Sequence, residues 1–442
     1  MTSSAASLRW LPGRIRLVPK QRAHRLATAA MSSKMHPKAA ERIREEESSI
    51  WVRFTALAAQ HASVNIGQGF PDYGPEDYVS KSLSEAAADP NLRHMYQYAR
   101  SFGHMPLVQN LAKLYSGTLG VEVDATEGVL VTVGAYMALF HTFAGYLNHG
   151  DEAIIIEPFF DCYTPQIRFT GATPVTIRLS TKKPFNDPTI CSEDMTIDFD
   201  QLERLATSKT KLLLLNNPNN PLGKLYSYGE LLKLAEFAQR HDLIVVADEV
   251  YEWLVFPPRK MFRMATLPKM FERTITIGSA GKTFSATGLK VGWAIGPPDL
   301  LEPLKMVHQN CSFNIPTLIQ EAVSRSREVV PATASRTAAQ TRSHGRHATS
   351  RRPPARSARI GFLMTTDFSE IHWPEDTYGN PADPVDYRFV EWLCKEKKVA
   401  SIPTSAFYDA PPTDQKLVRF CFYKKEETLD KAESLLLSAF AK

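Results

Sequence analysis

Lys282 is the residue whose place in the sequence points most directly to chemistry. It follows a β-branched stretch, residues 274–278, and a turn of small residues that includes Ser279. This spacing predicts an amine at the rim of a sheet, beside hydroxyl and backbone donors suited to a phosphate. A buried lysine can lose its proton and condense with the aldehyde of a cofactor. A lysine in a turn is more often solvated, so this interpretation depends on what the other strand ends offer.

Two further predicted strands end in polar groups of complementary chemistry. The apolar run 243–247 is followed by Asp248 and Tyr251, and the run 211–215 leads into an Asn-Pro turn that carries Asn220. In an open α/β sheet, ligands bind at the carboxyl ends of the strands. Asp248 is suited to hold a cationic ring nitrogen, whereas Asn220 and Tyr251 can bind a phenolate-type oxygen. As alternatives, Asp248 could cap a helix and the Asn-Pro run could be a structural turn.

Two more strand ends complete the pattern. Residues 153–156 precede Phe160, whose ring can lie against a flat ligand or simply pack in the core. A strand near residue 132 runs directly into a predicted helix that opens on Gly134, Ala135 and Tyr136. The free amides of such a first turn bind phosphate at the positive end of the helix. An amine, a carboxylate, an amide, an aromatic face and a phosphate site together predict a pyridoxal phosphate site.

Three of these stretches carry a family resemblance. Residues 279–293 (SAGKTFSATGLKVGW), 216–224 (NNPNNPLGK) and 248–251 (DEVY) resemble the signatures of the class I/II aminotransferases. The segments NIGQGFPD, PFFDCY and VHQN, which begin at residues 65, 158 and 307, resemble the kynurenine aminotransferases, a subgroup also called glutamine transaminase K or cysteine-conjugate β-lyase. The resemblance runs from about residue 48 to 321 and resumes from about 361 to the end.

The resemblance implies a role for each residue at the cofactor. Lys282 would attach the cofactor and later move a proton at the substrate Cα. Asp248 would keep the pyridine nitrogen protonated, so that the ring acts as an electron sink. Asn220 and Tyr251 would bind the ring oxygen, and Phe160 would stack on the ring. The residues implied at the phosphate end are Gly134, Ala135, Tyr136, Ser279 and Lys290. Lys290 stands where many relatives carry arginine, so it offers a point charge in place of a bidentate clamp.

The resemblance also implies a substrate site and a second subunit. Arg419, in the alternating stretch 417–422, would bind the substrate α-carboxylate with its forked guanidinium, although a flanked arginine could also face solvent. Gly69 would let the substrate approach the backbone. Trp51, Tyr136 and Phe160 would wall the side-chain pocket, which implies aromatic, long apolar or sulfur-bearing amino acids. Tyr98 would reach the phosphate end of the neighbouring subunit in a homodimer.

The implied activity is transfer of the amino group of kynurenine, glutamine or an aromatic or sulfur-containing L-amino acid to a 2-oxo acid. One alternative is β-elimination on cysteine S-conjugates at the same site. Another is an inactive product whose smaller domain is disrupted.

The expected fold is the α/β fold type I of pyridoxal-phosphate-dependent transferases. We expect a mainly parallel seven-stranded sheet flanked by helices, with a smaller α+β domain built from an N-terminal arm and the C-terminal part. The predicted divisions are a disordered leader at 1–44, the arm at 45–75, the large domain at 76–323, an anomalous segment at 324–360 and the small domain at 361–442.

Composition narrows the function classes. The chain of 442 residues has a formal net charge of +5, but the basic excess lies in the leader and in the anomalous segment. We therefore expect no nucleic-acid partner. No apolar run of membrane-spanning length is present, so no membrane partner is expected either. The five cysteines are scattered and never spaced as Cys-x-x-Cys, which favours reduced thiols and argues against a metal site.

The first 40 residues hold eight Lys/Arg and no acidic residue. This composition, rich in Arg, Ser and Ala, is typical of a mitochondrial presequence, with a plain disordered tail as the alternative. Met31 offers a second start, which would give an additional cytoplasmic form.

Residues 324–360 hold nine arginines, with no aromatic residue and no leucine. Such a stretch cannot bury enough apolar surface to order itself. A frame-shifted or mis-spliced stretch in the deduced sequence is the favoured interpretation, and a genuine disordered insertion is the alternative.

Overall fold

The computed structural model describes residues 40, 42, 49–183, 190–255, 258–326, 363–412 and 415–440. The chain divides into two units, Met1–Glu47 and Ser48–Lys442, and the sheets lie in the second. The predicted leader lies outside the described residues apart from positions 40 and 42. The anomalous segment is described only as far as residue 326.

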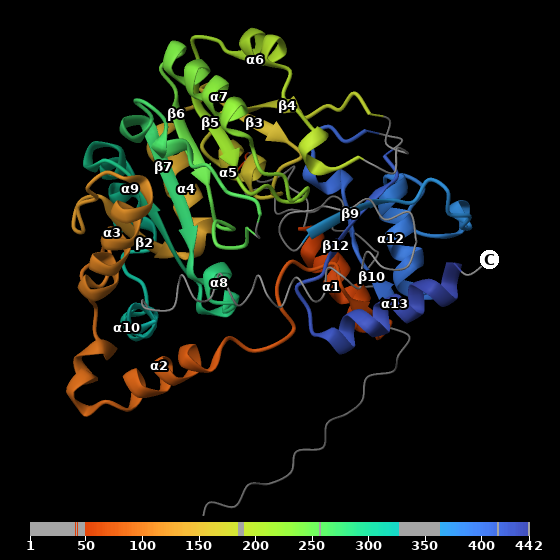
Figure 1. Cartoon of the computed structure of the whole chain (residues 1–442), viewed down its shortest axis with the longest axis horizontal. Helices are drawn as coiled ribbons and strands as arrows, with labels where there is room; N and C mark the ends of the chain where they lie inside the picture. The colour runs from red at the N-terminus through yellow and green to blue at the C-terminus, as the bar shows by residue number, and fades with distance from the viewer. Residues whose placement is uncertain are drawn as a thin grey trace, which may run out of the picture. The chain divides into compact units, whose positions relative to one another are not determined.

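A seven-stranded sheet forms the centre of the second unit (Figure 1). In spatial order its strands are β2 (Val129–Val133), β8 (Val291–Ile295), β7 (Thr274–Ser279), β6 (Ile244–Asp248), β5 (Thr210–Asn216), β3 (Glu152–Glu157) and β4 (Thr173–Arg178). β8 runs antiparallel to both of its neighbours, and all other pairs are parallel. The predicted mainly parallel sheet of seven strands is therefore confirmed.

The strands form where they do because both of their faces are apolar. On β5, Leu213 and Leu215 belong to the core beneath helix α7, whereas Leu212 and Leu214 belong to the core on the opposite face. Burial on both faces explains why the sequence shows continuous apolar runs rather than alternation. The pairing register also sets Asn216 beside Asp248, so the polar strand ends meet at one edge of the sheet.

Helices cover both faces of the sheet, as Figure 1 shows. One face packs against α6 and α7, and the other packs against α4, α5 and α9. The helices α3 and α10 pack beside β2 and β8 around a third apolar cluster. The bounds in this part are α2 (Asp77–Ala88), α3 (Met105–Leu119), α4 (Gly134–Tyr146), α5 (Tyr163–Phe169), α6 (Phe199–Leu205), α7 (Tyr228–Arg240), α8 (Ala280–Thr283), α9 (Pro298–Cys311) and α10 (Thr317–Arg325). Residues 76–326 are called the sheet part below.

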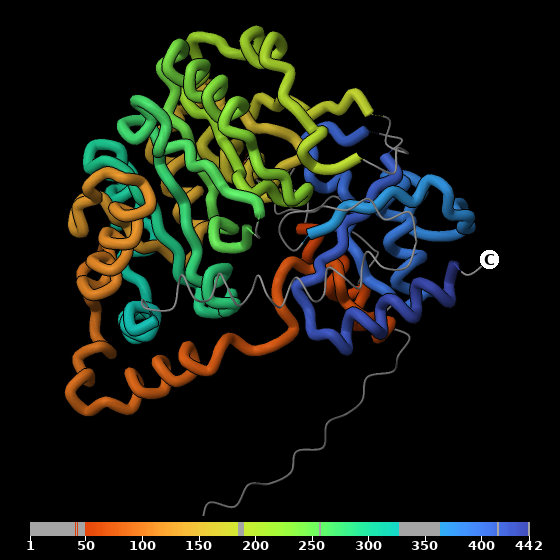
Figure 2. Tube along the Cα trace, in the orientation of Figure 1, coloured from red at the N-terminus to blue at the C-terminus, as the bar shows by residue number. Residues whose placement is uncertain are grey.

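A smaller part joins residues 49–75 to residues 363–440, and Figure 2 shows these two ends of the described chain side by side. β1 pairs in parallel with β10, and β12 lies between β11 and β9. Its own core contains Phe54 from the N-terminal arm with Phe389 and Val418 from the C-terminal stretch. The bounds are α1 (Ile50–Gln60), β1 (Val64–Asn65), β9 (Leu363–Asp367), α12 (Val385–Glu396), β10 (Val399–Ala400), β11 (Ile402–Pro403), β12 (Leu417–Cys421) and α13 (Glu426–Phe440). These residues are called the small part.

Capping residues and ion pairs mark the ends of several helices. Helix α7 begins at Tyr228, because Ser227 and Glu230 form a reciprocal capping box. The last described helix, α13, begins at Glu426. Helix α10 continues to Arg325, inside the stretch assigned to the anomalous segment, and Arg325 pairs with Glu321 one turn earlier at 2.7 Å.

Within the described ranges, no helix has the length and apolar run needed to cross a membrane. No group of three or more His, Cys, Asp or Glu residues there is arranged to hold a metal ion.

The contact of β8 with the first turn of α4 requires a glycine. A Cβ at Gly292 would overlap the backbone nitrogen of Ala135 and the backbone of Gly134. We expect Gly292→Ala to destabilise the protein by at least about 1–3 kcal/mol, because backbone atoms cannot move aside cheaply. Scanning calorimetry of the cofactor-free protein measures this effect.

Gly117→Ala is the matched control. Gly117 lies in α3 with no atom within 4 Å of a built Cβ, so the same change there should stabilise by about 0.5–1 kcal/mol. Equal unfolding temperatures for the two variants would contradict the close-approach argument.

Candidate active site

The predicted strand ends surround one cavity of about 210 Å³ at the carboxyl edge of the sheet. Ten of the predicted site residues line it: Gly134, Ala135, Tyr136, Phe160, Asn220, Asp248, Tyr251, Ser279, Lys282 and Lys290. Gly69, Arg419 and Trp51 border it through contacts with lining residues. Tyr98 alone is not brought to the cavity of its own chain.

Lys282 lies at the end of β7, in the short helix α8, and its side chain is half-buried. Its Nζ donates to the carbonyl oxygen of Gly69 at 3.1 Å. Burial lowers the pKa of Lys282 from 10.5 to about 8. A lysine in this state provides the neutral amine needed for attack on an aldehyde near physiological pH.

Asp248 is buried at the end of β6, on the same cavity. Tyr163 donates its hydroxyl to one carboxylate oxygen, and the backbone N–H of Val250 donates to the other at 3.3 Å. Burial raises the pKa of Asp248 to about 6, although these donors and the nearby Lys282 act in the opposite direction. The carboxylate is thus ionised at neutral pH and suited to face a cation.

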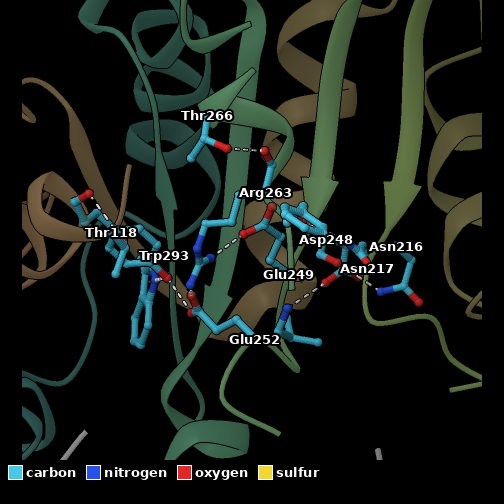
Figure 3. A network of polar contacts seen from close by, with 12 residues as sticks. Thr118, Asn216, Asn217, Asp248, Glu249, Glu252, Arg263, Thr266 and Trp293 are labelled. Atoms are coloured by element: carbon cyan, nitrogen blue, oxygen red, sulfur yellow. Dashed lines mark hydrogen bonds and ion pairs between the residues drawn. The ribbon is translucent and has the colours of Figure 1, made fainter. Parts of the chain in front are cut away.

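A second buried network lies behind Asp248 (Figure 3). Arg263 pairs with both Glu249 and Glu252, and it contacts Glu252 at 2.6 Å. Glu252 also accepts a hydrogen bond from Tyr115, which in turn accepts one from Trp293. The turn after β6 therefore carries Asp248 on the cavity side and the network around Arg263 on the other side. This network fixes the turn that presents Asp248.

Asn220 connects the cofactor end to the substrate end. Its backbone N–H donates to the Oδ1 of Asn216 at 2.7 Å, and its own Oδ1 accepts from Arg419 at 2.9 Å. With the carbonyl oxygen occupied, the amide nitrogen of Asn220 is the atom left to donate to a phenolate oxygen. A second guanidinium nitrogen of Arg419 donates to the carbonyl oxygen of Gly67 at 2.6 Å.

Arg419 is a buried cation whose hydrogen bonds go to neutral oxygens. It is 1% exposed, and within the described part of the chain no carboxylate lies within ion-pair distance of it. Its Nε is buried without a hydrogen-bond partner among those residues. Burial lowers its pKa. A guanidinium in this state is prepared to receive a ligand carboxylate.

The opposite end of the cavity is suited to an anion. Gly134 begins the helix α4 with φ +69°, and no side chain caps this helix start. The Nζ of Lys290 would lie 3.8 Å from a Cβ placed at Gly134, so the lysine reaches over the free amides. A cradle of free amides with a lysine above it fits a phosphate. Together with Lys282, Asp248 and Asn220, the donor set fits pyridoxal phosphate.

Aromatic rings form the remaining walls. Phe160 lies with its ring centroid 6.4 Å from that of Trp51 and 6.5 Å from that of Tyr136. Tyr98, by contrast, is 80% exposed and packs edge-to-face on Phe313.

Three contributors to the site were missed from the sequence. Tyr163, Asn216 and Asp161 hold Asp248, Asn220 and Trp51 respectively. Asn216 is the last residue of β5 and lies only four residues before Asn220, whereas the partners of Tyr163 and Asp161 are distant in sequence.

Comparison with known proteins agrees with this geometry. The family model for aminotransferase class I and II matches residues 62–434. The chain belongs to this family. It is 40% identical to human (Homo sapiens) kynurenine–oxoglutarate transaminase 3, with 97% of each chain covered.

Two solved structures resemble the fold of this aminotransferase. Bna3p of Saccharomyces cerevisiae has a TM-score of 0.83 at 31% identity, with 91% of this chain and 99% of that chain covered. YbdL of Escherichia coli, described as having a methionine aminotransferase function, has a TM-score of 0.80 at 27% identity, with 90% and 99% covered. The protein is a pyridoxal-phosphate-dependent aminotransferase that acts on amino acids and 2-oxo acids.

The lowered pKa of Lys282 predicts how cofactor capture depends on pH. Below pH 8 the amine is mostly protonated and unreactive, so the capture rate should rise about tenfold per pH unit and then level off. Absorbance of cofactor-free protein mixed with pyridoxal phosphate, between about pH 6.5 and 9, measures this rate. After borohydride reduction, Lys282→Ala should carry no covalently attached cofactor. A rate still rising at pH 10 would show an unperturbed lysine.

The raised pKa of Asp248 predicts a conflict between stability and binding. The stability contributed by this group is fully present below pH 3.8 and is lost as pH rises through about 6. At pH 8, cofactor-free Asp248→Asn should therefore unfold with up to about 3 kcal/mol more stability than wild type. It should also bind pyridoxal phosphate at least about tenfold more weakly, because the ring cation loses its counter-ion. Unfolding of both proteins at pH 5 and pH 8 provides the test, and parallel pH profiles would refute it.

Proposed function

We propose that this aminotransferase takes its amino group from kynurenine, glutamine or another amino acid with an aromatic, long apolar or sulfur-bearing side chain. A 2-oxo acid is the acceptor. The observation that carries the proposal is Arg419, a buried cation between the cofactor cavity and the ring of Trp51, 5.2 Å from that ring's centroid. This arrangement binds a carboxylate at one point and offers aromatic surface beside it.

The proposed role of the cofactor residues follows from their positions. Bound pyridoxal phosphate supplies an electron sink that stabilises negative charge at the substrate Cα. Asp248 keeps the ring nitrogen protonated, while Asn220 and Tyr251 hold the ring oxygen. Lys282 would attach to the aldehyde carbon of the cofactor and, when free, would move a proton at the substrate Cα. Gly134, Ala135, Ser279 and Lys290 hold the phosphate.

The preference for large donors rests on the walls of the substrate side. Phe160 and Tyr136 line the cavity, Trp51 packs near Phe160, and Phe407 adds a ring 6.4 Å from Trp51. Aromatic pairs are stabilised by edge-to-face and offset-stacked contacts as well as by the apolar area that they bury. The relative named for kynurenine supports the same donor class.

The hypothesis of a disrupted, inactive small part is disfavoured by the support around Arg419. Its strand, β12, pairs with β9 along five residues and with β11 on the other side. All three strands lie within the described residues, and the guanidinium they carry reaches Asn220 of the sheet part.

We also propose a homodimer in which Tyr98 reaches the phosphate end of the partner's site. Support comes from the exposure of Tyr98 together with its neighbours Tyr96 and Phe313, which are 64% and 51% exposed.

We further propose that the protein is imported into mitochondria, with Met31 as the start of an additional cytoplasmic form. The composition of residues 1–40 supports this proposal.

Purified holoenzyme, L-kynurenine and a 2-oxo acid test the donor proposal. We expect formation of the cyclised keto product at a rate that Lys282→Ala abolishes. Arg419→Met should lower kcat/KM by at least about 100-fold, because the donor carboxylate loses a charge-assisted bidentate contact. Pyruvate released from a cysteine S-conjugate in the same preparation measures β-elimination.

The outcomes separate the alternatives. Faster pyruvate release than transfer would favour the β-lyase assignment over transamination. Bound cofactor without either reaction would favour the inactive product.

A further inference from the structure

Asp161 is a carboxylate in the active-site region that the reaction does not use. It directly follows Phe160, and both of its oxygens accept hydrogen bonds from the indole Nε1 of Trp51, at 3.1 and 2.9 Å. Burial raises its pKa, which the bond from Trp51 and the charge of Arg419 partly offset. Burying a carboxylate costs free energy, so we expect Asp161 to have a role that its contact with Trp51 explains.

The two partners belong to different parts of the molecule. Asp161 follows strand β3 of the sheet part, whereas Trp51 lies in the first turn of α1 and packs against the core of the small part. Helix α1 is otherwise tied to the small part, for example by Arg53 and Asp383 at 2.6 Å. Among the described residues, the hydrogen bonds of α1 to the sheet part converge on Asp161.

The bond determines where the indole lies. The ring of Trp51 packs near Phe160 and Phe407, each at a centroid distance of 6.4 Å, and it faces the guanidinium of Arg419 at 5.2 Å. The indole therefore forms the wall beside the point where a substrate carboxylate binds. A donor with a large side chain must lie against this wall, whereas the methyl group of alanine is too short to depend on it.

We propose that Asp161 is a positioning residue that sets the donor preference by holding the indole of Trp51 across the substrate pocket. This inference rests on the proposed function of the same site. It assigns the selectivity for large side chains to a hydrogen bond between the two parts, rather than to the aromatic ring alone.

Four variants separate the hydrogen bond from the ring and from the charge. Trp51→Phe keeps an aromatic plate without the N–H, and Asp161→Leu keeps the volume without the acceptor. Asp161→Asn keeps an oxygen that can accept but removes the charge. The double variant Trp51→Phe/Asp161→Leu shows whether the two residues act as one unit.

The control is Asp383→Asn, the same change of carboxylate to amide at a different polar contact of helix α1. Asp383 joins Arg53 within the small part and lies away from the cavity. Donor preference in this variant should equal that of wild type.

The readout is the ratio of two dissociation constants, for 3-phenylpropanoate and for propanoate, measured on holoenzyme by the change in cofactor absorbance. Both ligands carry the same carboxylate and neither reacts, so the ratio cancels any change of charge beside Arg419. It is also independent of turnover, so it holds even if kynurenine is not a donor. Failure of the kynurenine assay alone would remove kynurenine as a proposed donor and leave this inference standing.

We expect 3-phenylpropanoate to bind about tenfold more weakly, relative to propanoate, in Trp51→Phe and in Asp161→Leu. The double variant should be no worse than either single variant, and Asp161→Asn should retain most of the preference. In steady state, KM for an aromatic donor should rise while kcat changes little, and KM for alanine should stay constant.

Three results would overturn the inference. They are an unchanged ratio in Asp161→Leu, additive losses in the double variant, or a loss of cofactor binding that accounts for the effect. A lower unfolding temperature with an unchanged ratio would likewise show that Asp161 has only a structural role.

Discussion

Three cations of the protein interior, each held by a backbone carbonyl oxygen, are the constraint on which the site depends. Arg419, Lys282 and Lys424 donate to the carbonyls of Gly67, Gly69 and Phe70, which are close together in the N-terminal arm. A buried cation that lacks a carboxylate is costly, since a carbonyl dipole compensates only part of its lost hydration. Burial accordingly lowers the pKa of all three groups. The fold thereby keeps positive charge ready for a phosphorylated cofactor and a carboxylate substrate.

The arm can serve these cations only because the two parts of the molecule close around it. β1 pairs with β10, and a Cβ at Gly67 would lie 2.7 Å from the carbonyl carbon of Ser401, so the backbones pack too tightly for any side chain there. From Gly67 onward, the carbonyl oxygens of the arm accept hydrogen bonds first from Arg419 of β12 and then from Lys282 of the sheet part. The substrate end is therefore assembled from segments more than 200 residues apart.

This assembly explains which features the sequence could predict. Strand ends depend on the local sequence. An apolar run followed by a polar residue predicted the bounds of β5, β6 and β7 within a residue or two. The same pattern predicted Asp248, Asn220 and Lys282 as site residues. Partners across the fold are not local. Neither the donation of Tyr163 to Asp248 nor that of Trp51 to Asp161 has a sequence signal, because each depends on how two elements pack. Arg419 was identified through family resemblance, since an alternating strand alone permits an outward-facing side chain.

The turn after β6 shows how one short stretch serves both chemistry and support. Asp248 and Tyr251 line the cavity, while Glu249 and Glu252 point away from it to Arg263 (Figure 3). Burial raises the pKa of Glu249, whereas its pairing with Arg263 acts in the opposite direction. Because Glu249 directly follows Asp248 in the chain, the ion pairs that hold Glu249 and Glu252 also restrain the backbone behind the group that faces the cofactor ring. The acid that must stay ionised thus has hydrogen-bond donors in Tyr163 and the backbone of Val250, a lysine across the cavity, and a buried ion-pair network in the turn behind it.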